Sequence, residues 1–190
     1  EEVGADVLDF KPGDRVAASC VAACGVCEPC KDGQPVHCTK KNVGCFGVSP
    51  LLPGCQAEYV RIPFADNTLY HIPDSLTDDD VLFVGDILST GYFGAEMAEI
   101  KVGDTVLIVG AGPVGMCAAV CARLLSPAKI IMLDGVRSRL DTCLQEGILA
   151  IAIDYTKEDV AQRLQEITDG RRVDRAIESI GKDSRMLTRM

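Results

Sequence analysis

The sequence has little of three features that define whole classes of protein: basic charge, unbroken apolar runs and histidine. Its 190 residues carry 19 Lys and Arg against 28 Asp and Glu, a formal net charge of −9, so nucleic acid and anionic membranes would both repel it. Residues 106–122 lack charge, but three glycines and a proline interrupt them, which argues against a membrane span. Neither His37 nor His71 stands beside an acid or nucleophile motif, so neither is predicted to be a ligand or a base.

The residues that open the sequence also lack the basic segment of a secretory signal. Glu1 and Glu2 are acidic where such a signal would be basic. With 47% hydrophobic and 25% charged residues, the chain can bury one sizeable core or two small ones. Ten cysteines in a chain without a recognisable signal predict a reducing compartment, and we expect a cytoplasmic protein.

Four of the cysteines form a compact cluster. Cys24, Cys27 and Cys30 are separated by two residues each, and Cys38 follows eight positions later. Four soft thiolates in one short loop are typical of a tetrahedral zinc site, and because all four positions are taken by sulfur the zinc would be structural. Free core cysteines or disulfides are the alternatives, but closely spaced cysteines among Gly, Pro and charged residues suit neither. The sequence therefore predicts a zinc lobe over about residues 20–45.

A glycine-rich turn follows a β-branched run later in the chain. Residues 105–109 predict a strand and residues 116–125 a helix of small side chains. The turn between them is predicted to bind a dinucleotide through Gly110, Gly112, Pro113, Val114 and Gly115. In such a turn the first glycine permits the tight bend, the second lets a pyrophosphate approach the helix N-terminus, and the third lets helix pack on strand.

The next predicted strand, residues 129–133, ends at an acidic residue. Asp134 stands nineteen positions after Gly115, where a carboxylate can accept both hydroxyls of a ribose. It would repel a 2′-phosphate, which favours NAD over NADP, although Arg137 and Arg139 follow closely and leave NADP open. We expect Arg139 to be a cofactor contact. A turn residue at a strand end is the alternative for Asp134.

Strand and helix patterns continue to alternate after Asp134. The sequence predicts a helix over 137–146, a buried strand over 150–153, a helix over 157–168 with Thr156 as its N-cap, and a strand over 173–180. Four strands with intervening helices indicate an α/β fold with a doubly wound, Rossmann-type parallel sheet. Because ligands bind at the carboxyl ends of such strands, Glu178 and Gly181 are predicted cofactor contacts.

These motifs together resemble a known family. CGVCEPC followed by Cys38, then AEYVRIPFAD, GDILSTGYFGAE and GAGPVG with Asp134, occur in the order seen in zinc-dependent medium-chain alcohol dehydrogenases, closest to the formaldehyde-dehydrogenase-like branch. The resemblance implies that residues 1–88 are part of a GroES-like, β-rich catalytic domain with the zinc lobe. It implies that residues 89–190 are the N-terminal part of an NAD-binding Rossmann domain.

The resemblance also suggests two residues of a catalytic site. Asp86 occupies the position where this branch places an aspartate on the catalytic zinc and other branches place a cysteine, and carboxylate oxygen is a reasonable zinc donor. Alternatively, Asp86 is the N-cap of a helix over 87–98, and the two roles are compatible. Thr90 resembles the family's nicotinamide-side contact, although a Thr-Gly pair in an apolar helix can equally serve close packing.

The function implied is oxidation of an alcohol, or of an aldehyde hydrate, with hydride transfer to NAD. A polyol or threonine dehydrogenase of the same superfamily is one alternative, and a zinc-stapled NAD-binding module without catalysis is another. The upstream segment that supplies other catalytic-zinc ligands in the family precedes the position where this sequence begins, so we expect the middle of a longer dehydrogenase, inactive as it stands if nothing precedes it. The family resemblance also implies a homo-oligomer, a dimer or tetramer.

Overall fold

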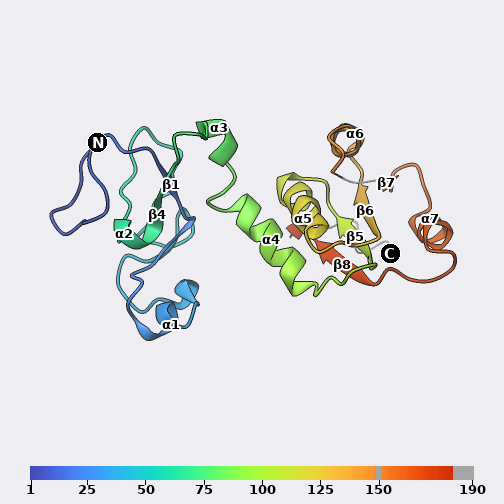
Figure 1. Cartoon of the computed structure of the whole chain (residues 1–190), viewed down its shortest axis with the longest axis horizontal. Coiled ribbons are helices and arrows are strands. Elements are labelled where there is room, and N and C mark those ends of the chain that lie inside the picture. Colours follow the sequence, from blue (N-terminus) through green and yellow to red (C-terminus); the bar gives the residue numbers. More distant parts are fainter. Residues whose placement is uncertain (149–150, 182–190) are drawn as a thin grey trace. The chain divides into compact units, whose positions relative to one another are not determined.

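The chain forms two compact units, Glu1–Asp86 and Ile87–Met190, in a computed structural model that describes residues 1–148 and 151–181 (Figure 1). No helix of these described residues is long and apolar enough to cross a membrane.

The first unit is built from short elements joined by long loops. Its elements are β1 (Val16–Ala18), β2 (Val21–Ala22), α1 (Glu28–Lys31), the 3-10 helix η1 (Pro35–His37), β3 (Gly44–Cys45), α2 (Ala65–Thr68), β4 (Leu69–His71) and α3 (Asp78–Val81). β1 pairs antiparallel with β4, and β2 pairs antiparallel with β3. Leu52 and Thr68 are fully buried among them, and the Thr68 hydroxyl donates to the Pro63 carbonyl oxygen at 3.0 Å. The strands are only two or three residues long, so the antiparallel pairing expected of a GroES-like domain is present but the unit is mostly loop.

The second unit alternates strands and helices. Its elements are α4 (Ile87–Met97), β5 (Thr105–Val109), α5 (Pro113–Arg123), β6 (Lys129–Asp134), α6 (Arg137–Gln145), β7 (Ile151–Asp154), α7 (Val160–Ile167) and β8 (Arg175–Glu178). All strands are parallel, in the order β7-β6-β5-β8. The order reverses between β5 and β8, and in open α/β sheets this switch point is where ligands bind, at the carboxyl ends of the strands.

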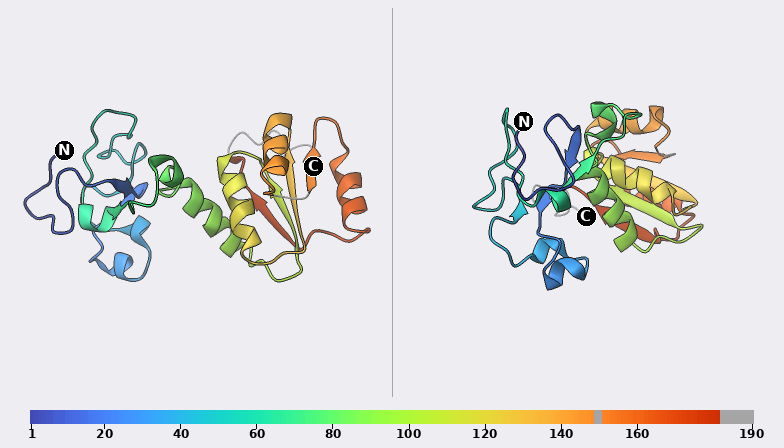
Figure 2. Two further views of the ribbon diagram at one scale, coloured as in Figure 1. Left: turned by 45° about the horizontal axis from the view of Figure 1, so that its top comes forward. Right: turned by 60° about the vertical axis from the view of Figure 1, so that its left-hand side comes forward.

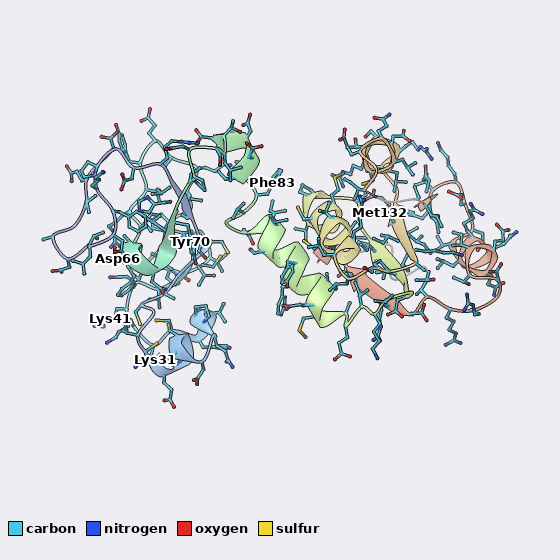
Figure 3. All side chains as sticks on the ribbon, viewed as in Figure 1. Lys31, Lys41, Asp66, Tyr70, Phe83 and Met132 are labelled. Atoms are coloured by element: carbon cyan, nitrogen blue, oxygen red, sulfur yellow. The ribbon has the colours of Figure 1, made fainter. Side chains whose placement is uncertain are left out.

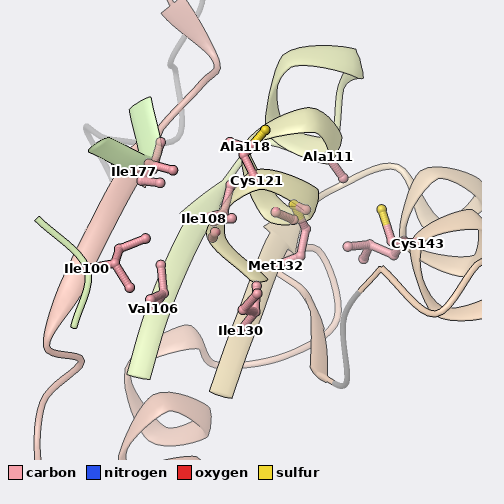
Figure 4. Packing of buried hydrophobic residues seen from close by; sticks show 14 residues of the cluster. Ile100, Val106, Ile108, Ala111, Ala118, Cys121, Ile130, Met132, Cys143 and Ile177 are labelled. Carbon is pink, nitrogen blue, oxygen red and sulfur yellow. The ribbon is translucent and has the colours of Figure 1, made fainter. Parts of the chain in front are cut away.

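Successive residues of the central strands point to opposite faces of the sheet, and each face is covered by helices (Figure 2). Val106, Ile108 and Met132 belong to the core under α4, α5 and α6 (Figure 4). Leu107 and Ile131 belong to the core on the other face, which includes residues of α7. Burial on both faces explains why β5 and β6 are continuous apolar runs.

Helices α4 and α5 approach closely because of one glycine. A side-chain carbon at Gly91 would lie 2.6 Å from the Ala118 nitrogen and 2.8 Å from the Cys117 Cβ. Within the Thr90-Gly91 pair, Gly91 therefore serves the close packing of the two helices, whereas Thr90 is exposed.

Some predicted boundaries are confirmed and others are wrong. The strand predicted over 173–180 is shorter, because β8 spans only Arg175–Glu178. β5 matches the prediction, β6 extends one residue beyond it to include Asp134, and Gly147 follows α6 with a left-handed φ of +63°. Helix α5 begins at Pro113, three residues earlier than predicted, because proline suits the first turn of a helix. The strand predicted over 150–153 is β7, Ile151–Asp154, and Ala150 lies outside the described residues.

Thr156 does not cap the helix after β7. The N-cap of α7 is Asp159, whose carboxylate accepts from the Gln162 N–H at 3.0 Å. The Thr156 N–H and hydroxyl both donate to Oδ1 of Asp154 instead, which holds Thr156 in a turn. The helix consequently starts at Val160 and not at residue 157.

Candidate functional site

The four clustered thiols converge as the spacing predicts. Their sulfur atoms all lie within 4.8 Å of one another, and the distance is 3.4 Å between Cys27 and Cys30, 3.7 Å between Cys27 and Cys38, and 4.0 Å between Cys24 and Cys30. A tetrahedral zinc with bonds of about 2.3 Å requires sulfur atoms about 3.8 Å apart. The cluster therefore has the size of a four-thiolate zinc site.

Local backbone groups prepare these sulfurs for a metal. The Cys24 N–H donates to the sulfur of Cys38 at 3.4 Å, and the Cys27 N–H donates to the sulfur of Cys24 at 3.4 Å. Hydrogen bonds from the backbone, that of Thr39 foremost, lower the pKa of Cys27 to about 6. Burial, followed by the neighbouring Cys27, raises the pKa of Cys30 to about 12. The pKa of each thiol is thus set by its own surroundings, and a divalent cation at the centre of the cluster would favour the thiolate form of all four.

The loop that carries the cluster is tied to α2. The Asn67 side-chain amide donates to the Ala23 carbonyl oxygen at 2.9 Å, immediately before Cys24. Gly25 has a left-handed φ of +72°, and a side-chain carbon there would lie 2.5 Å from Oδ1 of Asn67. Figure 3 shows the lobe around α1, where Lys31 is labelled. Within residues 1–148 and 151–181, these four cysteines are the one group of three or more His, Cys, Asp or Glu side chains arranged to hold a metal ion.

Each glycine of the turn between β5 and α5 is required, or leaves room, for a different structural reason. Gly110 has a φ of +102°, which a side chain would strain. A side chain at Gly115 would overlap the Gly110 carbonyl oxygen, so its absence lets α5 pack on the turn. No heavy atom lies within 4 Å of where a side-chain carbon at Gly112 would stand. The turn thus leaves open space at the N-terminus of an eleven-residue helix, where an anion is stabilised.

Asp134 is built into this turn. Its Oδ2 accepts from the Ala111 N–H at 2.6 Å, and its Oδ1 accepts from the Val136 N–H at 2.7 Å. The side chain is only 10% exposed, and Nη1 of Arg139 lies 4.0 Å from its Oδ2. A carboxylate has about four lone-pair sites, so two internal bonds leave capacity for ribose hydroxyls. Ala111 was not predicted to take part, because its role depends on its N–H group and not on its side chain.

The residues after β8 close the other side of the turn. The Ser179 hydroxyl oxygen lies 2.8 Å from the Val109 carbonyl oxygen and 3.1 Å from that of Gly110, and its single proton is donated between the two. The Glu178 carboxylate accepts from the N–H groups of Ile180 and Gly181. The predicted cofactor contacts at this end are thus next to the glycine turn, with Glu178 engaged in holding its own loop.

Asp86 is an exposed residue at the end of the first unit and directly precedes α4. The Cys20 N–H donates to the carbonyl oxygen of Gly85 at 3.0 Å, and this bond brings Cys20 beside Asp86, the next residue. Burial, then the charge of Asp86, then Cys45, raises the pKa of the Cys20 thiol to about 11, and the thiol is hydrogen-bonded to the Asp86 carboxylate. The sequence did not suggest this pair, because the two residues are far apart in the chain and share no motif.

The remaining candidates, and His71, which was not one of them, occupy simpler surroundings. Thr90 is exposed on α4. Pro113 and Val114 form the first turn of α5. His71 stacks on Phe10 with ring centroids 4.5 Å apart, and its Nε2 lies 3.0 Å from the Asp9 carbonyl oxygen. The ring of His71 thus has a structural role.

Comparison with known proteins identifies the same two parts. Residues 1–74 match the alcohol dehydrogenase GroES-like domain, and residues 113–189 match the zinc-binding dehydrogenase domain. Zinc-dependent alcohol dehydrogenase 2 from Streptococcus pneumonia superimposes with a TM-score of 0.84 at 42% identity, over 95% of this chain and 50% of that structure.

Two curated relatives are also similar over nearly the whole chain. The medium chain reductase/dehydrogenase ucsI of Acremonium sp is 35% identical over 98% of this chain and 65% of its own length. The glutathione-independent formaldehyde dehydrogenase of Pseudomonas aeruginosa is 35% identical over 97% of this chain and 48% of its own length.

The chain spans between 43% and 65% of the length of these curated relatives and of others like them. The zinc-binding domain match and the four-thiol cluster support zinc as a cofactor, and the family supports NAD as the second. Both domain matches, the fold and the order of the motifs agree: the chain belongs to the zinc-dependent medium-chain alcohol dehydrogenase family.

Proposed function

We propose that this chain carries the coenzyme turn and the structural zinc lobe of an NAD-linked dehydrogenase that oxidises an alcohol or an aldehyde hydrate. The observation that carries the proposal is the open space at Gly112, at the N-terminus of α5 and beside Asp134. Family membership supplies the reaction class, and the turn supplies a place for the dinucleotide.

In this proposal the residues of the second unit bind and orient the cofactor. Pro113 opens α5 but has no N–H group, so the donors that face the pyrophosphate through the gap at Gly112 begin with the N–H of Val114, which also lines the gap. Asp134 accepts the ribose hydroxyls, with Arg139 beside it to contact the same ribose. Gly181, with a φ of +74°, and Glu178 shape the loop on the far side of the turn. NAD, when bound, supplies the hydride acceptor.

We propose Asp86 as a ligand of the catalytic zinc and Thr90 as a contact on the nicotinamide side. The zinc, when bound, supplies a Lewis acid for the substrate oxygen. Asp86 is exposed and can reach a ligand, and the Cys20 thiol donates to its carboxylate and orients it. Orientation of a metal ligand by a neighbouring hydrogen bond is a common arrangement.

We assign the structural zinc to the tetrathiolate cluster. Cys24, Cys27, Cys30 and Cys38 occupy all four positions, so this zinc holds the lobe together and meets no substrate. The division of the chain near residue 88, into a GroES-like part and a Rossmann part, agrees with the two compact units.

The finer details of the proposal follow from the family. The aspartate at position 86 and the similarity to a formaldehyde dehydrogenase favour a small alcohol or aldehyde over a polyol or threonine as the substrate. We also propose a cytoplasmic homo-oligomer, a dimer or tetramer.

The test combines zinc analysis with turnover. The dialysed protein, an Asp86→Ala variant and a Cys27→Ser variant are compared for zinc per polypeptide and for NADH formation with short alcohols and formaldehyde. The proposal expects two zinc ions in the wild type, the loss of one in each variant, and NADH formation that Asp86→Ala abolishes. One zinc ion in both wild type and Asp86→Ala, with no NADH formed, would contradict the catalytic assignment.

A binding module without catalysis is the second candidate. It is favoured by one observation: among the described residues, Asp86 belongs to no group arranged to hold a metal ion. The same experiment separates the two, because a module would bind NAD and retain one zinc ion without forming NADH.

A further inference from the structure

A tyrosine ring covers the carboxyl edge of the sheet beside the proposed ribose site. Tyr155 follows β7 and Gly135 follows β6, and the last residues of these strands, Asp154 and Asp134, are paired in the sheet. A side-chain carbon at Gly135 would lie 2.5 Å from Cζ and 2.6 Å from the hydroxyl oxygen of Tyr155. The phenol ring therefore occupies the space that a side chain at position 135 would take.

The backbone under this ring is fixed on both sides. The Tyr155 N–H donates to the Asp134 carbonyl oxygen at 3.3 Å. Asp154, which is 2% exposed, accepts from both the N–H and the hydroxyl of Thr156 through Oδ1. Lys157 lies 3.7 Å from the other oxygen of Asp154. Tyr155 thus starts from a rigid turn, and little conformational freedom would be lost if a ligand packed against it.

The ring is not needed to fill a core. Tyr155 remains 41% exposed, and it belongs to neither buried cluster of the second unit. An aromatic ring that is held in place and still open to solvent is suited to stacking on another flat ring.

The position of the ring indicates what would stack on it, if the chain binds NAD as proposed above. The ribose assigned to Asp134 carries the adenine base on its C1′ atom, so only the ribose ring separates the base from that carboxylate. The residue directly after Asp134 is Gly135, which has no side chain to meet the base and is covered by Tyr155. We propose that Tyr155 is a positioning residue that forms an aromatic wall of the adenine subsite, and that Gly135 makes room for it.

The proposal predicts which ligands depend on the ring. Base–aromatic stacking lost by substitution to alanine corresponds to roughly a 5- to 150-fold weaker affinity. Tyr155→Ala should therefore raise the Kd for NAD and for ADP-ribose within that range. Tyr155→Phe keeps the ring and should stay within about twofold of the wild type. Nicotinamide mononucleotide has no adenine, so its affinity should not change.

The experiment is titration calorimetry of the purified protein with NAD, ADP-ribose and nicotinamide mononucleotide. Tyr59→Ala is the matched control, because Tyr59 is 72% exposed and lies in the first unit. Thermal unfolding of each variant confirms that it is folded. Parallel losses for NAD and ADP-ribose in Tyr155→Ala alone would support the inference.

Three results would overturn the inference. Unchanged or tighter binding of ADP-ribose by Tyr155→Ala would mean that the ring does not contact the base or that it obstructs it. An equal loss for nicotinamide mononucleotide would mean that the substitution disturbs the whole turn. A wild-type protein that binds neither NAD nor ADP-ribose would contradict the proposed function and this inference with it, whereas the other two results leave the proposed function intact.

Discussion

Replacing Gly112 and Gly115 by alanine, one at a time, should separate cofactor binding from folding. Gly112 has a φ of −75°, which alanine adopts freely, and its side-chain position is open. Gly112→Ala should therefore change the free energy of unfolding by no more than about 1 kcal/mol. The added methyl group would occupy the space assigned to the pyrophosphate, so the Kd for NAD should rise at least about tenfold, or about 1.4 kcal/mol.

Gly115→Ala should instead act on folding. Its methyl group would overlap the Gly110 carbonyl oxygen and lie 2.7 Å from the Ser179 hydroxyl oxygen. Alanine is better than glycine inside a helix by about 1 kcal/mol, and overpacking costs about 1–3 kcal/mol, so the expected loss of stability is up to about 2 kcal/mol.

Urea denaturation gives the free energy of unfolding, and titration calorimetry gives the Kd for NAD. Gly103→Ala is a control for glycine substitution, since Gly103 has open space around it but lies outside the turn; its φ of +88° predicts a loss of stability without a specific loss of NAD affinity. Wild-type affinity for NAD in Gly112→Ala would refute the reasoning, because a pyrophosphate could not then approach this glycine.

Three further predictions concern stability. Chelation of zinc should lower the thermal midpoint of the wild type and leave that of Cys27→Ser unchanged, because the thiolate cluster holds the lobe only when the metal is bound; differential scanning calorimetry with and without chelator checks this. Asp104 accepts from the Lys101 N–H and from Arg175, and these bonds, that from the Lys101 N–H foremost, lower the pKa of its carboxyl group. The folded pKa lies below the unfolded value of about 3.9, so the stability that the Asp104 carboxylate contributes is complete above that pH and is lost as the pH falls through the folded pKa. The difference in unfolding midpoint between wild type and Asp104→Asn should therefore shrink in acid. A difference that stays constant with pH would contradict the assignment. Leu140, a residue of α6, is fully buried, so Leu140→Ala should lower the free energy of unfolding in urea by about 2–5 kcal/mol, whereas Leu124→Ala, at a residue 73% exposed, should lower it far less.

The sequence was most informative where one local pattern determines one structure. The four cysteine positions predicted a cluster, and the structure brings their sulfurs together. The apolar runs within β5 and β6 could be recognised because a parallel strand covered on both faces is apolar along nearly all of its length. The parallel sheet followed from the alternation of strands and helices.

The start of α7 was predicted wrongly because two residues could cap it. Thr156 and Asp159 are both favoured N-cap types, and sequence preference alone does not rank them. Asp154 decides the outcome, because its buried carboxylate takes the Thr156 hydroxyl and N–H as partners. A competing bond from the preceding strand is a tertiary property that no helix pattern records.

The candidate site was predictable in its motifs but not in its internal bonds. Spacing identified Asp134, yet its bond to the Ala111 N–H depends on the backbone of the turn. Cys20 and Asp86 meet only because the chain folds them together, and Tyr155 faces Gly135 only because β6 and β7 are paired.

The most direct measurement of the central claim follows the hydride itself. The protein is incubated with NAD and primary alcohols that carry deuterium on the hydroxyl-bearing carbon, and the nucleotide product is analysed by mass spectrometry. The account predicts NADH that carries one deuterium from the alcohol. NADH without the label, or no NADH from any alcohol or hydrated aldehyde by a protein that binds both zinc and NAD, would contradict it.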